Sequence, residues 1–192
     1  RISGMYLYLI RHTRPVGEVG RCSGRLDVQL APTQASDCVA VTERLPAIQA
    51  LWSSSLTRCR VLAEAIGARD GVTPRIDERL CELQFGEWEG RRWDEIDRGQ
   101  SDRWAADYWN VAPPGGETYR ELYERVGAAL AEILTCNTSS IAVVTHAGPI
   151  RAALAQCLQL EPKRYAEVGL DHGRICLLRT NGAGWRLEYL NG

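Results

Sequence analysis

Four side chains in this sequence have the chemistry to bind and attack a phosphate group. Arg11 and His12 are adjacent, Arg58 lies further along the chain, and His146 comes later. A histidine can act as a nucleophile or as an acid and base near neutral pH. A guanidinium can hold an anion through two hydrogen bonds. A strand that ends in ordinary surface charge would show the same Arg-His pair. The predicted strands and helices around these residues must therefore decide between such a strand end and a phosphate site.

Three runs of apolar residues precede these side chains, and they are predicted strands at 5–10, 48–52 and 141–145. Predicted helices separate them, and strands that alternate with helices form a mostly parallel sheet. The carboxyl ends of such strands share one edge, where α/β proteins bind their ligands. His12, Arg58 and His146 are therefore expected to meet over one pocket.

The helices are predicted from apolar residues three and four positions apart, and they span about 33–45, 59–66, 119–134 and 150–157. Thr118 is the predicted N-cap of the third helix. Arg58 falls at the start of the second helix, where basic charge opposes the helix dipole unless an anion binds there. A short strand is predicted at 72–76, and Asn181-Gly182 predicts a hairpin between strands at 174–179 and 185–190.

The segment 87–115 is rich in tryptophan and charged residues. We interpret it as short helices packed over one end of the sheet, either as a lid or side wall of the site or as a peripheral pair without a role there. Glu82 lies in the loop that leads to this segment. A phosphate ester needs a proton donor for its leaving oxygen, and a carboxyl group can supply that proton. Glu82 is therefore a candidate acid.

The length of 192 residues and the net charge of −1 predict one domain, at 5–192, and argue against a nucleic-acid or membrane partner. No apolar run is long enough to span a bilayer. Residues 1–4 resemble the remnant of an expression tag ahead of Met5. Seven cysteines without C-x-x-C spacing predict reduced thiols in a cytoplasmic protein. Three histidines without a ligand cluster argue against a zinc site.

Five segments of the sequence resemble signature segments of the histidine phosphatase superfamily, in its phosphoglycerate mutase-like branch. They occur in the family's order, and they are Leu9-Ile-Arg-His-Thr13, Ser53-Ser-Ser-Leu-Thr-Arg58, Leu80-Cys-Glu-Leu-Gln-Phe-Gly-Glu-Trp-Glu-Gly90, Pro114-Gly-Gly-Glu-Thr118 and Val143-Val-Thr-His-Ala-Gly148. The resemblance implies a three-layer α/β/α sandwich with a mostly parallel central sheet. It also implies a phosphatase that acts on a small-molecule phosphate ester.

The resemblance implies a role for each matched residue. His12 would be the nucleophile that forms a phosphohistidine, while Arg11, Arg58 and His146 would hold the phosphoryl oxygens. Glu82 would protonate the leaving alcohol and then deprotonate the water that hydrolyses the intermediate. No metal and no other cofactor is implied, because the arginines supply the positive charge.

Four further residues are expected to contact the substrate. Ser23 and Gly24 match loop positions that contact the substrate in relatives, and the backbone N–H of Ala147 is expected to donate to the phosphate. Thr13 stands where the family usually has glycine, so it can narrow the pocket or add a hydroxyl donor. His172 has no motif around it and is predicted to have a surface or packing role.

The substrate is the least determined part of the prediction. Thr13-Arg14-Pro15 replaces the Gly-Glu-Thr/Ser run common in the family, and the sequence is most similar to the α-ribazole-phosphate phosphatase-like subgroup of cobalamin assembly. The alternatives are mutase-type phosphoryl transfer, a broad-specificity sugar or nucleotide phosphatase, and a catalytically weak module that binds a phosphate ligand or has a regulatory role. The oligomeric state stays open, with a homodimer as one option.

Overall fold

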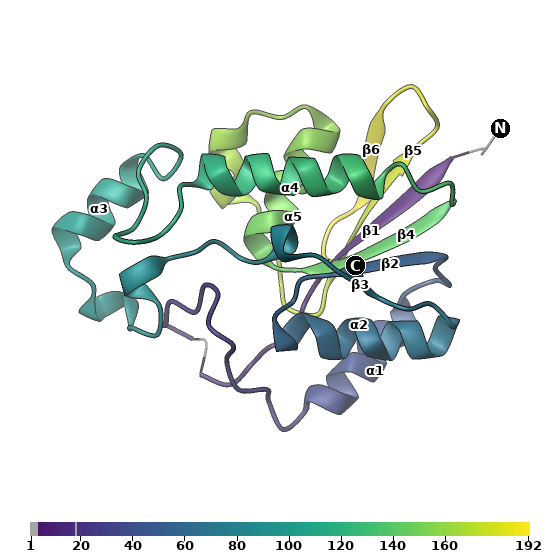
Figure 1. The fold of residues 1–192 in the computed structure, drawn as a ribbon, viewed down its shortest axis with the longest axis horizontal. Helices are drawn as coiled ribbons and strands as arrows, with labels where there is room; N and C mark the ends of the chain where they lie inside the picture. The colour runs from purple at the N-terminus through teal and green to yellow at the C-terminus, as the bar shows by residue number, and fades with distance from the viewer. Residues whose placement is uncertain (1–3, 18) are drawn as a thin grey trace.

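A single mixed sheet forms the centre of the molecule (Figure 1). The computed structural model describes residues 4–17 and 19–192, so residues 1–3 of the predicted tag remnant lie outside the described part. The strand order is β3-β2-β4-β1-β5-β6. The strands are β1 (Met5–Arg11), β2 (Ala50–Ser53), β3 (Arg75–Ile76), β4 (Ser140–Thr145), β5 (Ile175–Thr180) and β6 (Trp185–Tyr189).

The sheet has a parallel part and an antiparallel part. β1 to β4 pair in parallel with one another, whereas β5 pairs antiparallel with both β1 and β6. The prediction of a mostly parallel sheet is confirmed, and so is the hairpin at the end of the chain. β1 lies between β4 and β5, so both neighbours bring side chains to its carboxyl end.

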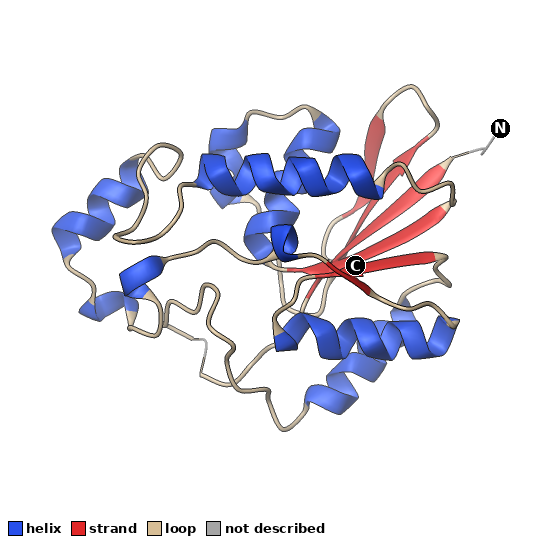
Figure 2. Ribbon diagram, viewed as in Figure 1, coloured by secondary structure: helices blue, strands red, loops and turns tan. Residues whose placement is uncertain are grey.

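Helices cover both faces of the sheet and complete the predicted three layers (Figure 2). They are α1 (Gln34–Arg44) and α2 (Thr57–Asp70) on one face, and α4 (Tyr119–Ile133) and α5 (Ala147–Leu158) on the other. Successive residues of β1 enter opposite cores, with Leu7 and Leu9 facing α4 and α5, and Tyr8 and Ile10 facing α1 and α2. Burial on both faces explains why the central strands β1 and β4 are nearly continuous apolar runs.

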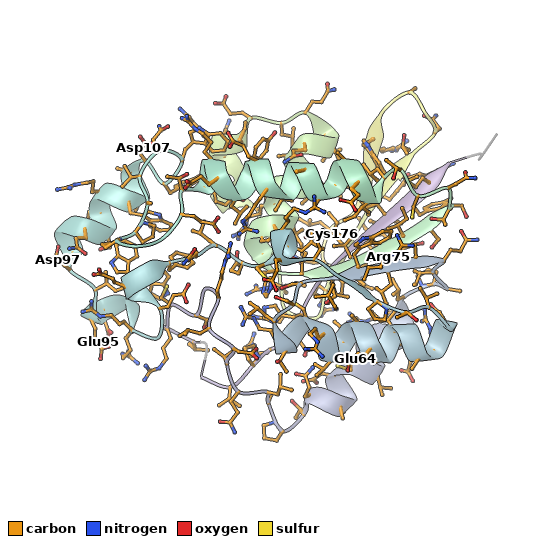
Figure 3. The ribbon with its side chains drawn as sticks, viewed as in Figure 1. Glu64, Arg75, Glu95, Asp97, Asp107 and Cys176 are labelled. Carbon is orange, nitrogen blue, oxygen red and sulfur yellow. The ribbon has the colours of Figure 1, made fainter. Side chains whose placement is uncertain are left out.

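The connection from β3 to α4 contains the tryptophan-rich segment. Its short helices are η1 (Glu78–Leu80), η2 (Gly86–Trp88), η3 (Trp93–Glu95) and α3 (Arg98–Ala106). α3 lies beyond the carboxyl ends of the parallel strands, away from the sheet, and its N-cap Asp97 is labelled in Figure 3. The Asp97 side chain accepts a hydrogen bond from the Gln100 N–H at 2.9 Å.

This segment packs against the loop that follows β1. Trp88 and Ile96 form a small core with Cys22 of that loop. Backbone hydrogen bonds reinforce the contact, because the Cys22 N–H donates to the Arg91 carbonyl and the Trp93 N–H donates to Gly20. The loop and the segment therefore form one continuous wall beside the sheet edge.

The start of α4 agrees with the sequence prediction. The Thr118 hydroxyl accepts the Glu121 N–H at 3.2 Å, and the Glu121 carboxylate accepts the Thr118 N–H at 2.7 Å, so the predicted N-cap of α4 is confirmed. All seven cysteines belong to the described part and are free thiols. A last short helix, η4 (Pro162–Glu167), leads from α5 toward β5. No helix within the described residues has the length and apolar character to cross a membrane.

Candidate active site

Most of the predicted site residues line one cavity of about 330 Å³. It lies at the carboxyl edge of the parallel strands, on the side of the molecule that carries the tryptophan-rich segment (Figure 1). The predicted residues that line it are Arg11, His12, Ser23, Gly24, Arg58 and Glu82. The topology explains this convergence, because β1, β2 and β4 are neighbours whose carboxyl ends share one edge.

His12 directly follows β1 and is only 2% exposed. Its backbone N–H donates to the Thr145 carbonyl at 3.0 Å, which continues the pairing of β1 with β4. Its ring nitrogen Nδ1 lies 2.8 Å from the Thr13 carbonyl oxygen. A carbonyl only accepts hydrogen bonds, so Nδ1 carries the proton and, in the neutral ring, Nε2 keeps its lone pair. The His12 ring is therefore held in the tautomer that a nucleophile needs.

His146 directly follows β4 and is completely buried beside His12, with a ring centroid distance of 5.0 Å. Its Nε2 lies 2.9 Å from the Ser54 hydroxyl and 3.4 Å from the Cys59 sulfur. Burial, and then the nearby charges of His12 and Arg58, hold the pKa of His146 well below its usual 6.5. The ring is therefore neutral and can serve as a hydrogen-bonding group beside His12.

Arg58 lies in the first turn of α2 and is 1% exposed. Its Nη1 donates to the Leu26 carbonyl and its Nη2 to the Gly24 carbonyl, both at 2.7 Å, which holds the loop after β1 over the pocket. Among the described residues Arg58 forms no ion pair, and its buried Nε has no hydrogen-bond partner. A buried positive charge without a carboxylate partner is costly, so this position favours a bound anion. Arg11 reaches the same cavity and also donates to the Leu170 carbonyl.

Glu82 lies after η1, at the side of the same cavity. Its Oε1 accepts the Leu83 N–H at 2.9 Å, and its Oε2 accepts the Gly148 N–H of α5 at 3.3 Å. A Cβ added to Gly148 would lie 2.2 Å from Glu82 Oε1, so this approach requires glycine at position 148. The carboxyl group is thus held by backbone donors on both oxygens.

A partly buried ion pair holds the loop that carries Glu82. Arg125 of α4 donates to the Cys81 carbonyl at 2.7 Å and to the Glu82 carbonyl at 3.0 Å. The same guanidinium pairs with Glu117 at 2.6 Å. Burial tends to raise the pKa of Glu117, but hydrogen bonds and charge from Arg125 outweigh it and lower the pKa below its usual value. Glu117 therefore stays ionised and supports the loop through Arg125.

Two predicted substrate-contact residues do not line the cavity. The Thr13 hydroxyl donates to Gln34 Oε1 at 2.8 Å, and Thr13 lines a neighbouring pocket instead. Ala147 is buried at the start of α5, and the next N–H, that of Gly148, is the one that meets Glu82.

Several residues that sequence reasoning missed also line the cavity, and they are Arg14, Arg21, Phe85, Trp93 and His172. His172 was predicted to have a surface or packing role, and the structure places its ring 5.2 Å from that of His12 and at this cavity, so it packs beside a site residue. The prediction considered only the carboxyl ends of parallel strands. β5 runs antiparallel to β1, so the segment before β5 reaches the same edge. The predicted hairpin was the signal that could have revealed this.

Comparisons with known proteins give a consistent result. A model of the histidine phosphatase superfamily (branch 1) matches residues 7–192. The glucosyl-3-phosphoglycerate phosphatase of Mycobacterium tuberculosis strain H37Rv is 31% identical over 179 residues, which cover 85% of this chain and 79% of the relative. The putative phosphoserine phosphatase 2 of Hydrogenobacter thermophilus is 25% identical over 191 residues, which cover 96% of this chain and 94% of the relative.

Solved structures agree with the sequence relatives. The native structure of a mycobacterial glucosyl-3-phosphoglycerate phosphatase has a TM-score of 0.88 and 26% identity, and the match covers 98% of this chain and 99% of that one. The α-ribazole phosphatase of Shigella flexneri has a TM-score of 0.90 at 22% identity, covering 98% of this chain and 96% of that one. This second likeness concerns the fold alone.

Proposed function

The chain belongs to branch 1 of the histidine phosphatase superfamily and hydrolyses phosphate esters, and we propose that it does so through a phosphohistidine on His12. The observation that carries this proposal is the 2.8 Å contact between His12 Nδ1 and the Thr13 carbonyl. It leaves Nε2 with a lone pair beside the buried charge of Arg58, where a phosphate would bind. A module that only binds phosphate has no need of this tautomer, nor of a carboxyl group at the side of the pocket.

The proposed first step transfers the phosphoryl group to His12. Nε2 attacks phosphorus, the N–P bond forms, and the bond to the leaving oxygen breaks. Glu82, in its protonated form, gives its proton to that oxygen, so the leaving group departs as an alcohol. Arg11 and Arg58 hold the nonbridging oxygens and supply the positive charge that a metal ion provides in other phosphatases. We therefore propose a metal-independent reaction.

The proposed second step returns the enzyme to its starting state. The Glu82 carboxylate takes a proton from a water molecule, whose oxygen attacks phosphorus. The N–P bond breaks, inorganic phosphate leaves, and Nε2 of His12 regains its lone pair. The rim of the cavity includes Trp93, which is 39% exposed. An open rim admits water to the intermediate, which favours hydrolysis over mutase-type transfer.

The position of the acid indicates where the leaving group would lie. In-line attack places the leaving oxygen opposite Nε2 and beside Glu82. On that side of the cavity Phe85 and Trp93 form an aromatic wall, and their ring centroids lie 5.6 Å apart. Such a wall suits a flat ring or the apolar face of a sugar. We propose α-ribazole 5′-phosphate, which carries a planar base, as the first candidate substrate, and a sugar-linked phosphoglycerate such as the one that names the mycobacterial relative as the second.

The mechanism is tested with 4-nitrophenyl phosphate in the presence of EDTA. The wild type is expected to release 4-nitrophenol, and His12→Ala is expected to lose this activity. Acid-labile phosphate, trapped by rapid quench during turnover, should map to His12. Wild-type activity in His12→Ala, or loss of wild-type activity in EDTA that added metal restores, would contradict the proposal.

The substrate is tested by phosphate release from α-ribazole 5′-phosphate, glucosyl-3-phosphoglycerate, 3-phosphoglycerate, sugar phosphates and nucleotides. We expect the highest kcat/KM for α-ribazole 5′-phosphate. Comparable values across the panel would instead identify a broad-specificity phosphatase. Conversion of 3-phosphoglycerate to 2-phosphoglycerate faster than its hydrolysis would identify a mutase.

A further inference from the structure

His172 reaches the nucleophile because of the way the sheet is connected. β1 lies between β4 and β5. His146 follows the carboxyl end of the parallel neighbour β4, whereas His172 precedes the amino end of the antiparallel neighbour β5. The two ends meet the carboxyl end of β1, so His12 has an imidazole neighbour from each flanking strand. The ring centroids lie 5.0 Å and 5.2 Å from that of His12, with tilts of 61° and 63°.

Backbone hydrogen bonds hold the turn that carries His172. The Gly173 N–H is shared between the carbonyl oxygens of Arg11, at 3.1 Å, and His12, at 3.0 Å. The Arg11 N–H donates to the Arg174 carbonyl at 3.1 Å. Gly173 has a φ of +64°, a conformation that favours glycine, and an added Cβ would lie 3.2 Å from Val41. The turn is therefore tied to the same residues that carry the nucleophile.

A third contact comes from α1. The Arg44 guanidinium donates to the Gly173 carbonyl at 2.6 Å, so the turn is held from a second element as well. The side chain of His172 is half-buried and lines both the active-site cavity and the neighbouring pocket. Hydrogen bonds to the N–H and to the carbonyl of Gly173 thus hold the backbone next to His172, and the His172 ring lies between the two cavities.

The plane of the His12 ring needs support from neighbouring side chains. Rotation of an imidazole about its own Cβ–Cγ bond has a broad, roughly two-fold preference, so the rotamer alone does not fix the ring plane. The contact between Nδ1 and the Thr13 carbonyl restrains one ring atom. Small errors in the direction of an attacking atom are costly, since a displacement of about 1 Å can slow a reaction by about 10²-fold.

We propose that His172 is a positioning residue, whose ring edge packs against the His12 imidazole and keeps Nε2 directed into the phosphate cavity. This inference rests on the proposed phosphohistidine mechanism. His146 restrains the ring from the β4 side, and His172 restrains it from the β5 side. The contact is one of ring packing, so an aromatic ring without nitrogen atoms should serve in place of the imidazole.

The test compares His172→Ala, His172→Phe and, as a matched control on the same turn, Asp171→Ala. With 4-nitrophenyl phosphate we expect kcat/KM to fall about 10- to 100-fold in His172→Ala, because the ring of His12 gains freedom. His172→Phe should stay within about 3-fold of the wild type, because the ring edge is kept. Asp171→Ala should match the wild type, because the Asp171 side chain does not line the active-site cavity.

A second readout separates positioning from general damage. The inhibition constant of inorganic phosphate should be unchanged in His172→Ala, because Arg11 and Arg58 still hold the anion. Wild-type kcat/KM in His172→Ala would overturn the proposal. So would a His172→Phe variant as slow as His172→Ala, since ring nitrogens rather than the ring edge would then be required. The phosphate trap on wild-type His12 decides the phosphohistidine mechanism separately, so failure of one idea is not mistaken for failure of the other.

Discussion

The active-site cavity has two unlike parts, a floor and a rim. The floor consists of Arg11, His12 and Arg58, which line the cavity, and of His146, which is buried beside His12 and does not line it; all four follow or end the parallel strands or start α2. The rim consists of Arg14, Arg21, Phe85, Trp93 and His172, which lie in connecting segments. In the floor His12, Arg58 and His146 are at most 2% exposed, whereas Trp93 in the rim is 39% exposed.

This difference separates the reaction from the choice of substrate. The buried floor groups are held by strand pairing and by hydrogen bonds, and in the proposed mechanism those that line the cavity bind the phosphate group that every substrate shares. In the same proposal the rim groups contact the leaving group, in which substrates differ, and connecting loops tolerate sequence change better than strands do. Changes in the floor should therefore affect all substrates alike, and changes in the rim should affect them unequally.

Glu82 lies where floor and rim meet, and its substitution should have a larger effect than substitution of His146 or Trp93. Glu82→Gln keeps the shape but removes the acid, and a general acid contributes about 10²–10⁴-fold. We expect a loss of that size with alkyl phosphates, whose leaving groups need a proton. The loss with 4-nitrophenyl phosphate should be much smaller, because 4-nitrophenolate leaves without one. Equal slowing of both esters, measured as kcat/KM, would remove Glu82 from the acid role.

His146 tests the burial of the floor through the pH dependence of stability. Its folded-state pKa is held well below 6.5 by burial, so below about pH 6.5 the unfolded chain takes up a proton that the folded protein does not. The free energy of unfolding should therefore fall as the pH drops below 6.5, by up to about 1.4 kcal/mol per pH unit from this residue. Above that pH this contribution should be complete and constant.

The measurement for His146 is urea unfolding of the wild type and His146→Gln between pH 5 and pH 8. The difference in unfolding free energy between the two proteins should shrink as the pH falls below 6.5, because glutamine does not titrate. A difference that stays constant through this range would mean that His146 takes up its proton at the same pH in the folded protein as in the unfolded chain. The floor would then be less strongly desolvated than its burial indicates.

Trp93 tests the rim and should give the smallest effect. Trp93→Ala removes the exposed part of the aromatic wall, and aromatic packing contributes about 0.5–1.5 kcal/mol beyond buried area. We expect KM to rise about 3- to 10-fold for esters with a planar base, at nearly unchanged kcat. Substrates with small aliphatic leaving groups should serve as controls with little change in KM. A similar loss with every substrate would place Trp93 in the support of the floor instead.

Sequence reasoning succeeded best where a side chain directly follows a parallel strand. His12 and His146 end apolar runs that are recognisable from neighbouring residues, and parallel strands bring such ends together by topology alone. Arg58 was found because its charge is unfavourable at a helix start without an anion. Glu82 was harder to place, since its position depends on the Gly148 N–H and on the Arg125–Glu117 pair, both distant in sequence.

The sequence by itself determined the strands, the helices, the α/β order and the residues with phosphate chemistry, because these depend on local periodicity and side-chain type. Tertiary structure alone decided that the His172 ring lies beside that of His12, that the Thr13 hydroxyl donates to Gln34, and that Trp93 lines the active-site cavity. The antiparallel pairing of β5 with β1 and the packing of the tryptophan-rich segment on the loop after β1 produce these contacts. Such pairings join residues far apart in the chain, and local sequence patterns carry little information about them.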